Sequence, residues 1–413
     1  MSRRVVITGM GAVTPVGNNV NDFWSSIKNG VSGIDFIKSF DTTDFKVKIA
    51  AEVKDFDPTL YVQKKELKRN DMVSIYGIAA ATQAVEDSGL NLDEINKERL
   101  GVIVGSGIGG MATIQEQVGK LYEKGPSKVS PLFIPMAISN MVAGNIAIKF
   151  GAQGICENVV TACASGTNCI GDAFRSIKHG YSDIIIAGGA EAAISQIGVA
   201  GFTNLTALST NPDPKKACRP FDKDRDGFVM GDGSGIVILE ELEHALKRGA
   251  KIYGEVVGYG ATGDAYHMTA PSPDGSGAGR AMKLAMEEAE ITPSDVSYIN
   301  AHGTSTPANE TSEIKAINYA LGDVASNVPV SSTKSMTGHL LGAAGAIEAI
   351  VCVKALEEGF IPPTLNVDEK DENCNFDCVP YVGRSADLKY ALSNSLGFGG
   401  HNAVLCFKKW EGK

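Results

Sequence analysis

Short runs of β-branched residues that close on glycine alternate along this chain with longer stretches of helical periodicity. The strand-like runs cover residues 5–9, 102–104, 183–187 and 236–239, and the helical patterns cover 73–88 and 279–290. Regular alternation of the two periods is typical of α/β layers built around a largely buried sheet. The sequence therefore predicts an α/β fold.

The alternation is weakly repeated in two halves of the chain. The strand-to-glycine turn at residues 5–12 has a counterpart at 255–262. In each half a later strand leads through small residues into a helix rich in Gly and Ala, at 158–166 and at 328–345. Two fused copies of one α/β unit would explain this pattern. Chance likeness among glycine-rich turns is the alternative that the pattern leaves open.

Charge and composition exclude several classes of protein. The 413 residues include 38 Lys and Arg against 48 Asp and Glu, a net charge of −10, which disfavours nonspecific binding to nucleic acid or anionic membranes. No apolar run approaches the ~20 residues of a membrane span, and residues 5–9 fit a first strand better than a signal peptide. Eight scattered cysteines predict reduced thiols. We therefore expect a cytoplasmic protein.

Cys163 lies between the β-branched run 159–161 and a predicted helix, among small residues. A helix N-terminus supplies unpaired N–H groups and a positive dipole end, which lower the pKa of a thiol. Small neighbours leave room for a substrate, as at a nucleophile held on a sharp strand-to-helix turn. A buried structural cysteine is the alternative, and for a thiol considered alone it is the commoner one.

Two histidines lie at turns that suit chemistry better than packing. His302 follows the predicted strand 296–299, and His339 precedes the Gly- and Ala-rich helix. The chain has only six histidines, and both of these are flanked by Gly and Thr. For either histidine taken alone, a structural role is the commoner explanation. The loop 394–402 places Phe398 between glycines, where the backbone can move or approach a ligand closely. A simple hairpin turn is equally compatible with this loop.

Three tempting motifs fail on their spacing. Residues 105–110 match G-x-G-x-x-G, but no carboxylate follows ~20 residues later, so we exclude a dinucleotide site. Residues 222–227 imitate a calcium loop, yet Gly233 stands where a bidentate Glu belongs, so we expect a salt-linked structural loop. Cys374 and Cys378 lack a second ligand pair and are weak evidence for zinc. The sequence predicts no metal site.

A basic cluster stands out in this acidic protein. Lys64, Lys65, Lys68 and Arg69 fall within one or two helical turns, mostly on one face. A solvated helix surface is the usual explanation of such a run. The alternative is a positive patch that steers an acidic partner.

Together the motifs resemble the elongating β-ketoacyl-acyl-carrier-protein synthases. The resemblance rests on residues 161–166, 301–306, 334–345 and 394–400, and segments 5–11 and 227–233 fit as well. These segments span nearly the whole chain in the expected order. The resemblance implies a thiolase-like fold, a five-layer αβαβα arrangement of two duplicated halves. It divides the chain into residues 1–251, which carry the cysteine, and 252–413, which carry both histidines.

The resemblance also implies a decarboxylative Claisen condensation in type II fatty-acid elongation. Cys163 would take the acyl chain from acyl-carrier protein. Malonyl-carrier protein would then lose carbon dioxide, and His302 and His339 would stabilise the resulting enolate. Backbone N–H groups of Cys163 and Phe398 would form the oxyanion hole. No cofactor is needed, because decarboxylation drives the reaction.

Further roles follow from the same resemblance. Lys334 and Glu348 would form a charged pair behind His339, and Phe398 would act as a gate. The expected substrate-binding residues are Thr304 and Thr306 for the pantetheine arm, Ile108 and Phe202 for the acyl chain, Gly399 beside the gate, and Phe133 from the second copy of a homodimer. Lys65, Lys68 and Arg69 would bind the acidic carrier protein.

Related activities are the alternatives. Initiating and chalcone-type synthases carry Asn in place of the second histidine, so His339 argues against them. A degradative thiolase needs a second cysteine on a Gly-rich turn, whereas Cys406 lies within the predicted strand 403–407. A polyketide-type ketosynthase subunit remains open. A non-catalytic chain-length partner lacks the nucleophile, so Cys163 argues against it. The preferred acyl chain length does not follow from motif spelling.

Overall fold

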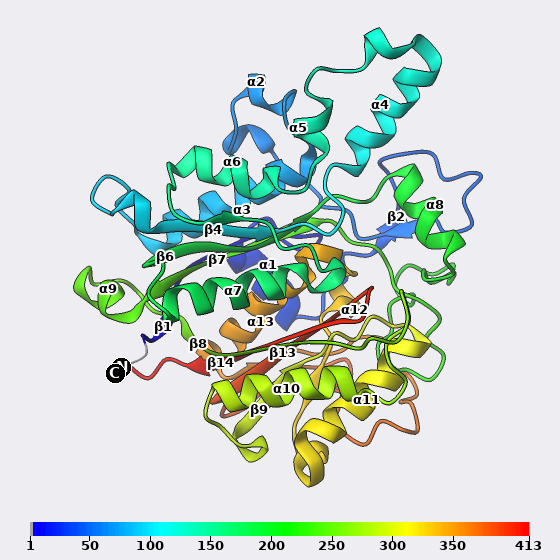
Figure 1. Ribbon diagram of the computed structural model, residues 1–413. Coiled ribbons are helices and arrows are strands. Elements are labelled where there is room, and N and C mark those ends of the chain that lie inside the picture. The colour runs from blue at the N-terminus through cyan, green and yellow to red at the C-terminus, as the bar shows by residue number, and fades with distance from the viewer. Residues whose placement is uncertain (1–2, 413) are drawn as a thin grey trace.

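The computed structural model describes residues 3–412. Five strands of the main sheet come from the N-terminal half: β1 (Val5–Val13), β4 (Leu100–Gly105), β5 (Cys156–Glu157), β6 (Ile184–Glu191) and β7 (Gly233–Glu241). Five come from the C-terminal half: β8 (Gly254–Gly263), β9 (Val296–Asn300), β10 (Val330–Ser331), β13 (Tyr390–Gly397) and β14 (His401–Lys409). Their order is β10-β9-β13-β14-β8-β1-β7-β6-β4-β5, so the two halves join where β1 pairs with β8 (Figure 1).

The two sets of strands repeat one topology. Moving outward from the junction, β1–β7 and β7–β6 are antiparallel, and β6–β4 and β4–β5 are parallel. On the other side, β8–β14 and β14–β13 are antiparallel, and β13–β9 and β9–β10 are parallel. The weak sequence repeat is therefore a repeat of strand order and direction, and the predicted duplicated α/β fold is confirmed. The division at residue 251 stays a prediction.

Helices complete five layers. Between the two groups of strands lie α7 (Ser165–Lys178) and α13 (Ala344–Glu358) (Figure 1). The outer layers are α3 (Met72–Ser88) with α6 (Met141–Phe150) on the N-terminal half, and α10 (Ser276–Glu288) with α11 (Pro307–Leu321) on the C-terminal half. Nearly every residue of α13 is buried, as expected for a helix that is apolar on all sides.

The remaining elements are short or peripheral. The other helices are α1 (Val20–Lys28), α2 (Lys64–Leu67), α4 (Met111–Lys124), α5 (Phe133–Ala137), α8 (Gln196–Asn204), α9 (Leu242–Lys247) and α12 (Lys334–Thr337). Two small sheets pair β2 (Asp35–Phe36) with β3 (Ile49–Ala50) and β11 (Phe360–Ile361) with β12 (Arg384–Ser385). Within residues 3–412 no helix has the length and apolar character needed to span a bilayer.

One local prediction is wrong. Residues 159–161 are not a strand, because β5 ends at Glu157. The next residue, Asn158, donates its side-chain amide to the carbonyl groups of Val104 (2.9 Å) and Ser139 (3.1 Å). A side chain thus takes the hydrogen bond that a continuing ladder would have used. The segment that leads to Cys163 is therefore an irregular approach rather than a strand end.

The loop at residues 222–227 is held by hydrogen bonds and ion pairs, as expected. The Asp222 carboxylate accepts the N–H groups of Asp368 and Glu369, each at 2.9 Å. The buried Arg225 guanidinium lies 2.7 Å from the Asp371 carboxylate. These contacts dock the loop on the segment around residue 370, as expected for a structural loop.

Candidate active site

Cys163 lies in a single 3₁₀ turn, Ala162–Ala164, immediately before α7. Ala162 has φ = +51°, a conformation that non-glycine residues seldom adopt. Ser165 stabilises the turn, because its hydroxyl accepts from the Thr161 N–H at 3.0 Å and donates to the Ala162 carbonyl at 2.7 Å. The helix α7 therefore begins two residues after Cys163, and the sharp turn expected to present its side chain is present.

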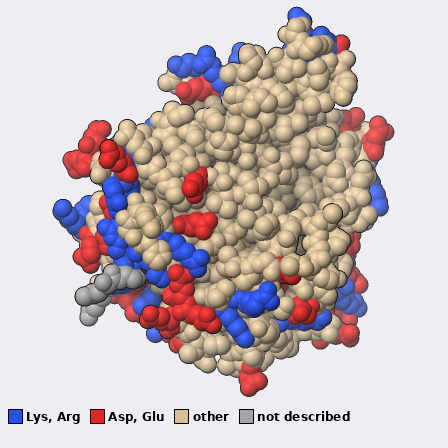
Figure 2. Space-filling model, viewed as in Figure 1, with Lys and Arg blue, Asp and Glu red and all other residues tan. Residues whose placement is uncertain are grey.

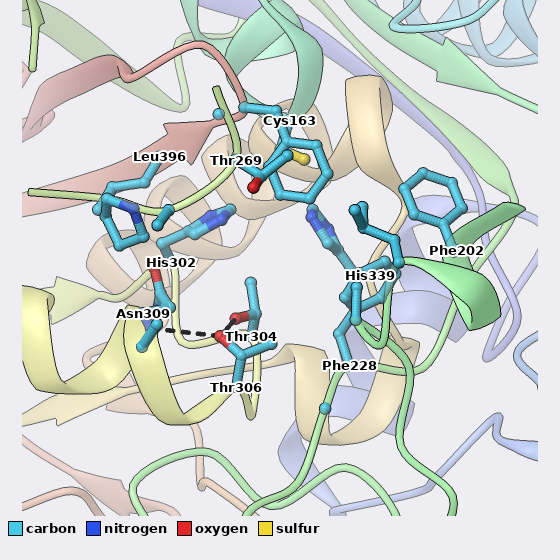
Figure 3. A pocket seen from close by; sticks show the side chains of 18 of the residues that line it. Cys163, Phe202, Phe228, Thr269, His302, Thr304, Thr306, Asn309, His339 and Leu396 are labelled. Atoms are coloured by element: carbon cyan, nitrogen blue, oxygen red, sulfur yellow. Dashed lines mark hydrogen bonds between the residues drawn. The ribbon is translucent and has the colours of Figure 1, made fainter. Parts of the chain in front are cut away.

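Cys163, His302 and His339 line one cavity of about 300 Å³. Figure 3 shows both imidazole rings reaching from opposite sides into the space near the sulfur. The ring centroids lie 5.3 Å apart with the ring planes at 85°. The three residues are far apart in the sequence, so this convergence is a product of the fold.

His302 is positioned by a carboxylate from the next helix. The Glu313 carboxylate on α11 accepts the N–H groups of His302 (2.7 Å) and Gly303 (2.8 Å). Gly303 has φ = +37°, which lets the chain turn directly after β9. These two N–H groups have no partner among the described strands of the sheet, so the Glu313 carboxylate accepts their hydrogen bonds and stabilises the turn.

His339 is positioned by backbone pairing instead. Its N–H donates to the Val229 carbonyl at 2.7 Å, and its carbonyl accepts the Gly231 N–H at 2.9 Å. The Phe228 ring lies edge-on to the imidazole, with centroids 5.2 Å apart. The segment 228–231 thus fixes both the backbone and one ring face of His339.

A buried ion pair lies behind the two histidines. Lys334 contacts the Glu348 carboxylate, and each side chain is only 1% exposed. Burial, with the Lys334 charge second, holds the pKa of both His302 and His339 well below the ordinary value. Both rings are therefore neutral at physiological pH, and each carries one N–H that can donate to a substrate oxygen.

The thiol is less acidic than the helix that follows it would predict. Burial raises the pKa of Cys163 to about 12, and the Glu191 charge adds to the rise. Lys334 and the backbone N–H groups of Phe398 and Cys163 lower the pKa, but burial outweighs them. The expectation of a lowered pKa is wrong here, because Cys163 is only 8% exposed and has lost most of its hydration. The two N–H groups that contact the sulfur are the pair expected to form the oxyanion hole.

Other expected residues line the same cavity. Thr304 and Thr306 are joined through their hydroxyls at 2.9 Å on one wall (Figure 3). Phe202 and Phe398 line another part, with ring centroids 6.5 Å apart. Phe398 lies at the tip of the β13–β14 hairpin, where Gly399 (φ = +90°) and Gly400 (φ = +74°) form the turn.

Sequence profiles of known families match both halves of the chain. The profile "Beta-ketoacyl synthase, N-terminal domain" matches residues 2–245, and "Beta-ketoacyl synthase, C-terminal domain" matches residues 253–368. The chain belongs to the β-ketoacyl synthase family. Proteins of this family are condensing acyltransferases, and the matched segments include Cys163, His302 and His339.

Full-length relatives support the same assignment. The chain is 53% identical to 3-oxoacyl-[acyl-carrier-protein] synthase 2 of Synechocystis sp., with 99% of each chain covered. It is 54% identical to the protein of the same name from Vibrio harveyi, over 98% of this chain and 99% of the relative. These relatives place this β-ketoacyl synthase among the acyltransferases that elongate fatty acids.

Solved structures share the thiolase-like ketosynthase fold. A β-ketoacyl synthase from Burkholderia phymatum is 36% identical, with a TM-score of 0.92 over 99% of this chain and all of the other. A ketosynthase solved in complex with its type II polyketide acyl-carrier protein is 35% identical, with a TM-score of 0.91 over the full length of both chains.

Five expected site residues of this synthase lie outside the main cavity: Lys334, Glu348, Ile108, Gly399 and Phe133. Ile108 packs on the apolar cluster that contains Cys163, and Glu348 lies beneath the cavity with Lys334. Gly399 lies at the hairpin tip next to the lining residue Phe398. Phe133 begins α5 and is half-buried. The basic cluster, Lys64, Lys65, Lys68 and Arg69, is exposed on and after α2, away from the cavity.

Sequence reasoning missed several contacts of the site. Leu341 and Phe228 line the cavity, although both lie inside motifs quoted for other residues. The Asn402 amide donates to the Asp264 carboxylate at 2.7 Å, and the Asp264 N–H donates to the Gly400 carbonyl at 2.9 Å. These bonds join the hairpin tip to the segment after β8. Only the position of Asn402 within the glycine-rich loop could have signalled this link.

The described residues offer no assembled site for a metal ion. Within residues 3–412 no cluster of three or more His, Cys, Asp or Glu side chains has metal-binding geometry. The Asn300, Ser393 and Asn394 side-chain oxygens and one Glu348 oxygen, however, are buried without hydrogen-bond partners among the described residues. Ser393 and Asn300 are neighbours across β13 and β9.

Proposed function

We propose that this β-ketoacyl synthase forms the acyl-enzyme on Cys163 during fatty-acid elongation. The sulfur attacks the acyl thioester carbonyl, the bond to the pantetheine sulfur breaks, and the thiol proton leaves with the carrier thiol. The N–H groups of Cys163 and Phe398 stabilise the oxyanion, at about 3 kcal/mol per donor. The raised pKa of Cys163 fits a thiol that stays protonated until a substrate arrives.

His302 and His339 serve the second half of the cycle. Malonyl-carrier protein loses carbon dioxide, and the electron pair of the broken C–C bond forms an enolate. Two neutral imidazoles donate hydrogen bonds to the enolate oxygen. They do so without placing a further charge in the buried cavity. The enolate carbon attacks the acyl-enzyme carbonyl, the C–S bond breaks, and the departing Cys163 thiolate takes a proton from solvent to regenerate the thiol. The Lys334 charge helps to keep His302 and His339 neutral, and Glu348 balances the charge of Lys334 itself.

The lining of the cavity suits two different parts of the substrate. Among the described lining residues, only Thr304 and Thr306 have hydroxyl groups hydrogen-bonded to each other. This pair of hydroxyls suits the amides of the pantetheine arm. Phe202 and Phe398 form an apolar wall beside Cys163, where an acyl chain would pack. Phe398 on its glycine hairpin acts as the gate between the acylation and malonyl steps.

We assign the carrier-protein dock to the basic cluster near α2. Lys and Arg gather on the projection that carries α2 in Figure 2. Lys65, Lys68 and Arg69 are exposed, and none forms an ion pair within residues 3–412. An acidic carrier protein would meet positive charge here on a protein of net charge −10. The related polyketide ketosynthase solved with its carrier protein supports this class of partner.

A homodimer completes the proposal. Figure 2 shows a broad face with few charged side chains in the region of α5, α7 and α8. Ile134 next to Phe133 is 58% exposed, Val160 is 51% exposed, and β5 is a free sheet edge. Apolar surface beside an unpaired edge strand fits a second copy of this chain. We place the homodimer in the cytoplasm, with the chain divided near residue 251 into its two halves.

The convergence of Cys163, His302 and His339 in one cavity carries this proposal. The test is intact mass of the protein after incubation with carrier protein loaded with acyl chains of several lengths. We expect one acyl adduct, which peptide mapping assigns to Cys163. No adduct with any acyl donor would favour a non-catalytic chain-length partner instead.

A further inference from the structure

The glycine motif at residues 105–110 binds no dinucleotide, but the structure gives it another partner. Directly after β4, the turn closes on the side chain of Glu191, the last residue of β6. The Glu191 carboxylate accepts from the Ser106 hydroxyl (2.9 Å), the Gly107 N–H (2.8 Å) and the Ile108 N–H (3.3 Å). Glu191 is fully buried.

The same carboxylate also holds a turn of the other half. Its second oxygen accepts the Gly342 N–H at 2.9 Å, in the 3₁₀ turn Leu341–Ala343. A Cβ at Gly342 would come within 2.4 Å of the Gly107 nitrogen and 2.7 Å of the Glu191 carboxylate. The two glycines let both backbones reach one oxygen, and no larger residue fits.

The two turns carry the side chains next to the nucleophile. Ile108 packs on the apolar cluster that contains Cys163 and Leu341, and Leu341 lines the main cavity. Their backbones are bonded to Glu191 at Ile108 itself and at the residue after Leu341. Because side-chain positions follow the backbone, one buried carboxylate fixes both Leu341 in the cavity wall and Ile108, which packs on the cluster around Cys163.

Burying this carboxylate has a cost that the contacts only partly offset. Burial raises the pKa of Glu191, and the four donors lower it again. The Glu191 charge also raises the pKa of Cys163, which works against its reactivity. The Glu191 carboxylate is therefore better explained by the two turns that it holds together than by an electrostatic effect on Cys163.

We propose that Glu191 is a positioning residue that sets acyl-chain discrimination by locking the turns of Ile108 and Leu341 against Cys163. The proposal rests on the assignment of Cys163 as the acylated residue. Glu191→Gln keeps the shape but points an NH₂ group at backbone N–H donors, so the two turns separate. Acyl chains that the native wall rejects then fit.

The experiment measures kcat/KM for a series of acyl-carrier-protein donors that differ by two carbons. We expect Glu191→Gln to lower the ratio of the preferred chain to the next longer chain at least about fivefold, within the range of methylene discrimination. The thermal midpoint and the rate of Cys163 alkylation at fixed pH accompany each variant. Removing the negative charge should leave alkylation as fast as in the native protein or faster.

Two further variants make the result decisive. Ser106→Ala removes one donor to Glu191 and should lower the same ratio by a smaller factor, so it serves if Glu191→Gln does not fold. Asp232→Asn is the matched control. Asp232 is a neighbouring buried carboxylate that accepts the N–H groups of Ala193 (2.9 Å) and Ile194 (3.2 Å) and contacts neither turn. It should leave the ratio unchanged.

Either of two results overturns the inference. One is an equal loss of kcat/KM for every chain length in both Glu191→Gln and Ser106→Ala, which is the signature of a general structural defect. The other is an equal fall in discrimination for Asp232→Asn. Failure of the underlying assignment looks different, because the native protein itself would then carry no acyl adduct on Cys163.

Discussion

Each half of this synthase has a 3₁₀ turn directly before its central helix, but the two turns differ in the side chain that they present. In the N-terminal half, Ala162 (φ = +51°) opens a 3₁₀ turn that leads into α7. In the C-terminal half, Leu341 (φ = +47°) opens a 3₁₀ turn that leads into α13. The second residue is Cys163 in one turn and Gly342 in the other. One turn presents the proposed nucleophile, and the other has no side chain at the matching place.

The difference follows from how the turns face each other at the centre of the molecule. A Cβ at Gly166, on the first turn of α7, would lie 2.9 Å from the Gly342 carbonyl, so the two segments are already in close contact. There is room for one reactive side chain between them. The C-terminal half contributes instead through His302 and His339, which line the same cavity as the thiol, and through Lys334 behind them. The two halves thus contain equivalent turns, and only the N-terminal turn carries the proposed nucleophile.

Removal of the nucleophile tests the comparison most severely. Cys163→Ala should lower condensation by about 10⁴-fold or more, because no acyl-enzyme can form. Its thermal midpoint and elution volume should match those of the native protein, since the turn accepts a methyl group. Condensation at the native rate in this variant would show that the reactive group lies elsewhere.

Removal of either imidazole should separate the contributions of the two halves. His302→Ala or His339→Ala should slow malonyl decarboxylation by about 10²- to 10³-fold, the effect of one lost oxyanion donor. Acylation of Cys163, followed by mass, should fall much less. An equal loss in both steps would mean that the histidines act on the nucleophile rather than on the enolate.

A methyl group added at Gly342 should show that the 3₁₀ turn Leu341–Ala343 has no room for a side chain at this position. Gly342→Ala should lower the free energy of unfolding by about 2 kcal/mol or more, because its Cβ overlaps the Gly107 backbone. Chemical denaturation measures the change, with Cys163→Ala as the matched control at the equivalent position. Equal stability of the two alanine variants would refute the difference between the turns.

Charge reversal on α2 should give the smallest effect. Changing Lys65 and Lys68 to Glu should raise KM for the carrier protein about tenfold at low salt, and the effect should shrink as salt screens the charges. Acylation by a small-molecule thioester should not change. If KM for the carrier protein stays the same, the cluster is an ordinary solvated surface.

The sequence reveals the parts of the site whose chemistry is local. Cys163, His302, His339 and Phe398 stand among glycines and small residues, and this local pattern alone marks each of them as a candidate. Strand and helix periods indicate α3, α10 and β4 within a few residues, whereas α4, α6 and α11 are not predicted. The sequence alone does not decide whether the two halves repeat one unit. The direction of each strand and its neighbours in the sheet cannot be read from the local amino-acid pattern.

Features that depend on distant segments are not predictable in this way. The helix after Cys163 predicts a low pKa for the thiol, yet burial by both halves outweighs the helix. The role of Glu191 needs β4, β6 and the turn at Gly342 to meet. Glu313 on α11 supports His302, and Asp264 supports the hairpin of Phe398, through contacts that no motif spacing encodes.

The position of β13 and β14 in the sheet has a consequence for synthesis on the ribosome. These strands follow all the others in the sequence, yet they lie between β8 and β9 and carry Phe398 at their connecting hairpin. The inner layer of helices therefore stays uncovered on one side while the nascent chain emerges. Folding must wait for pairings between distant residues, and such slow steps leave apolar surface exposed. We expect the emerging chain to depend on chaperones until β14 has paired with β8.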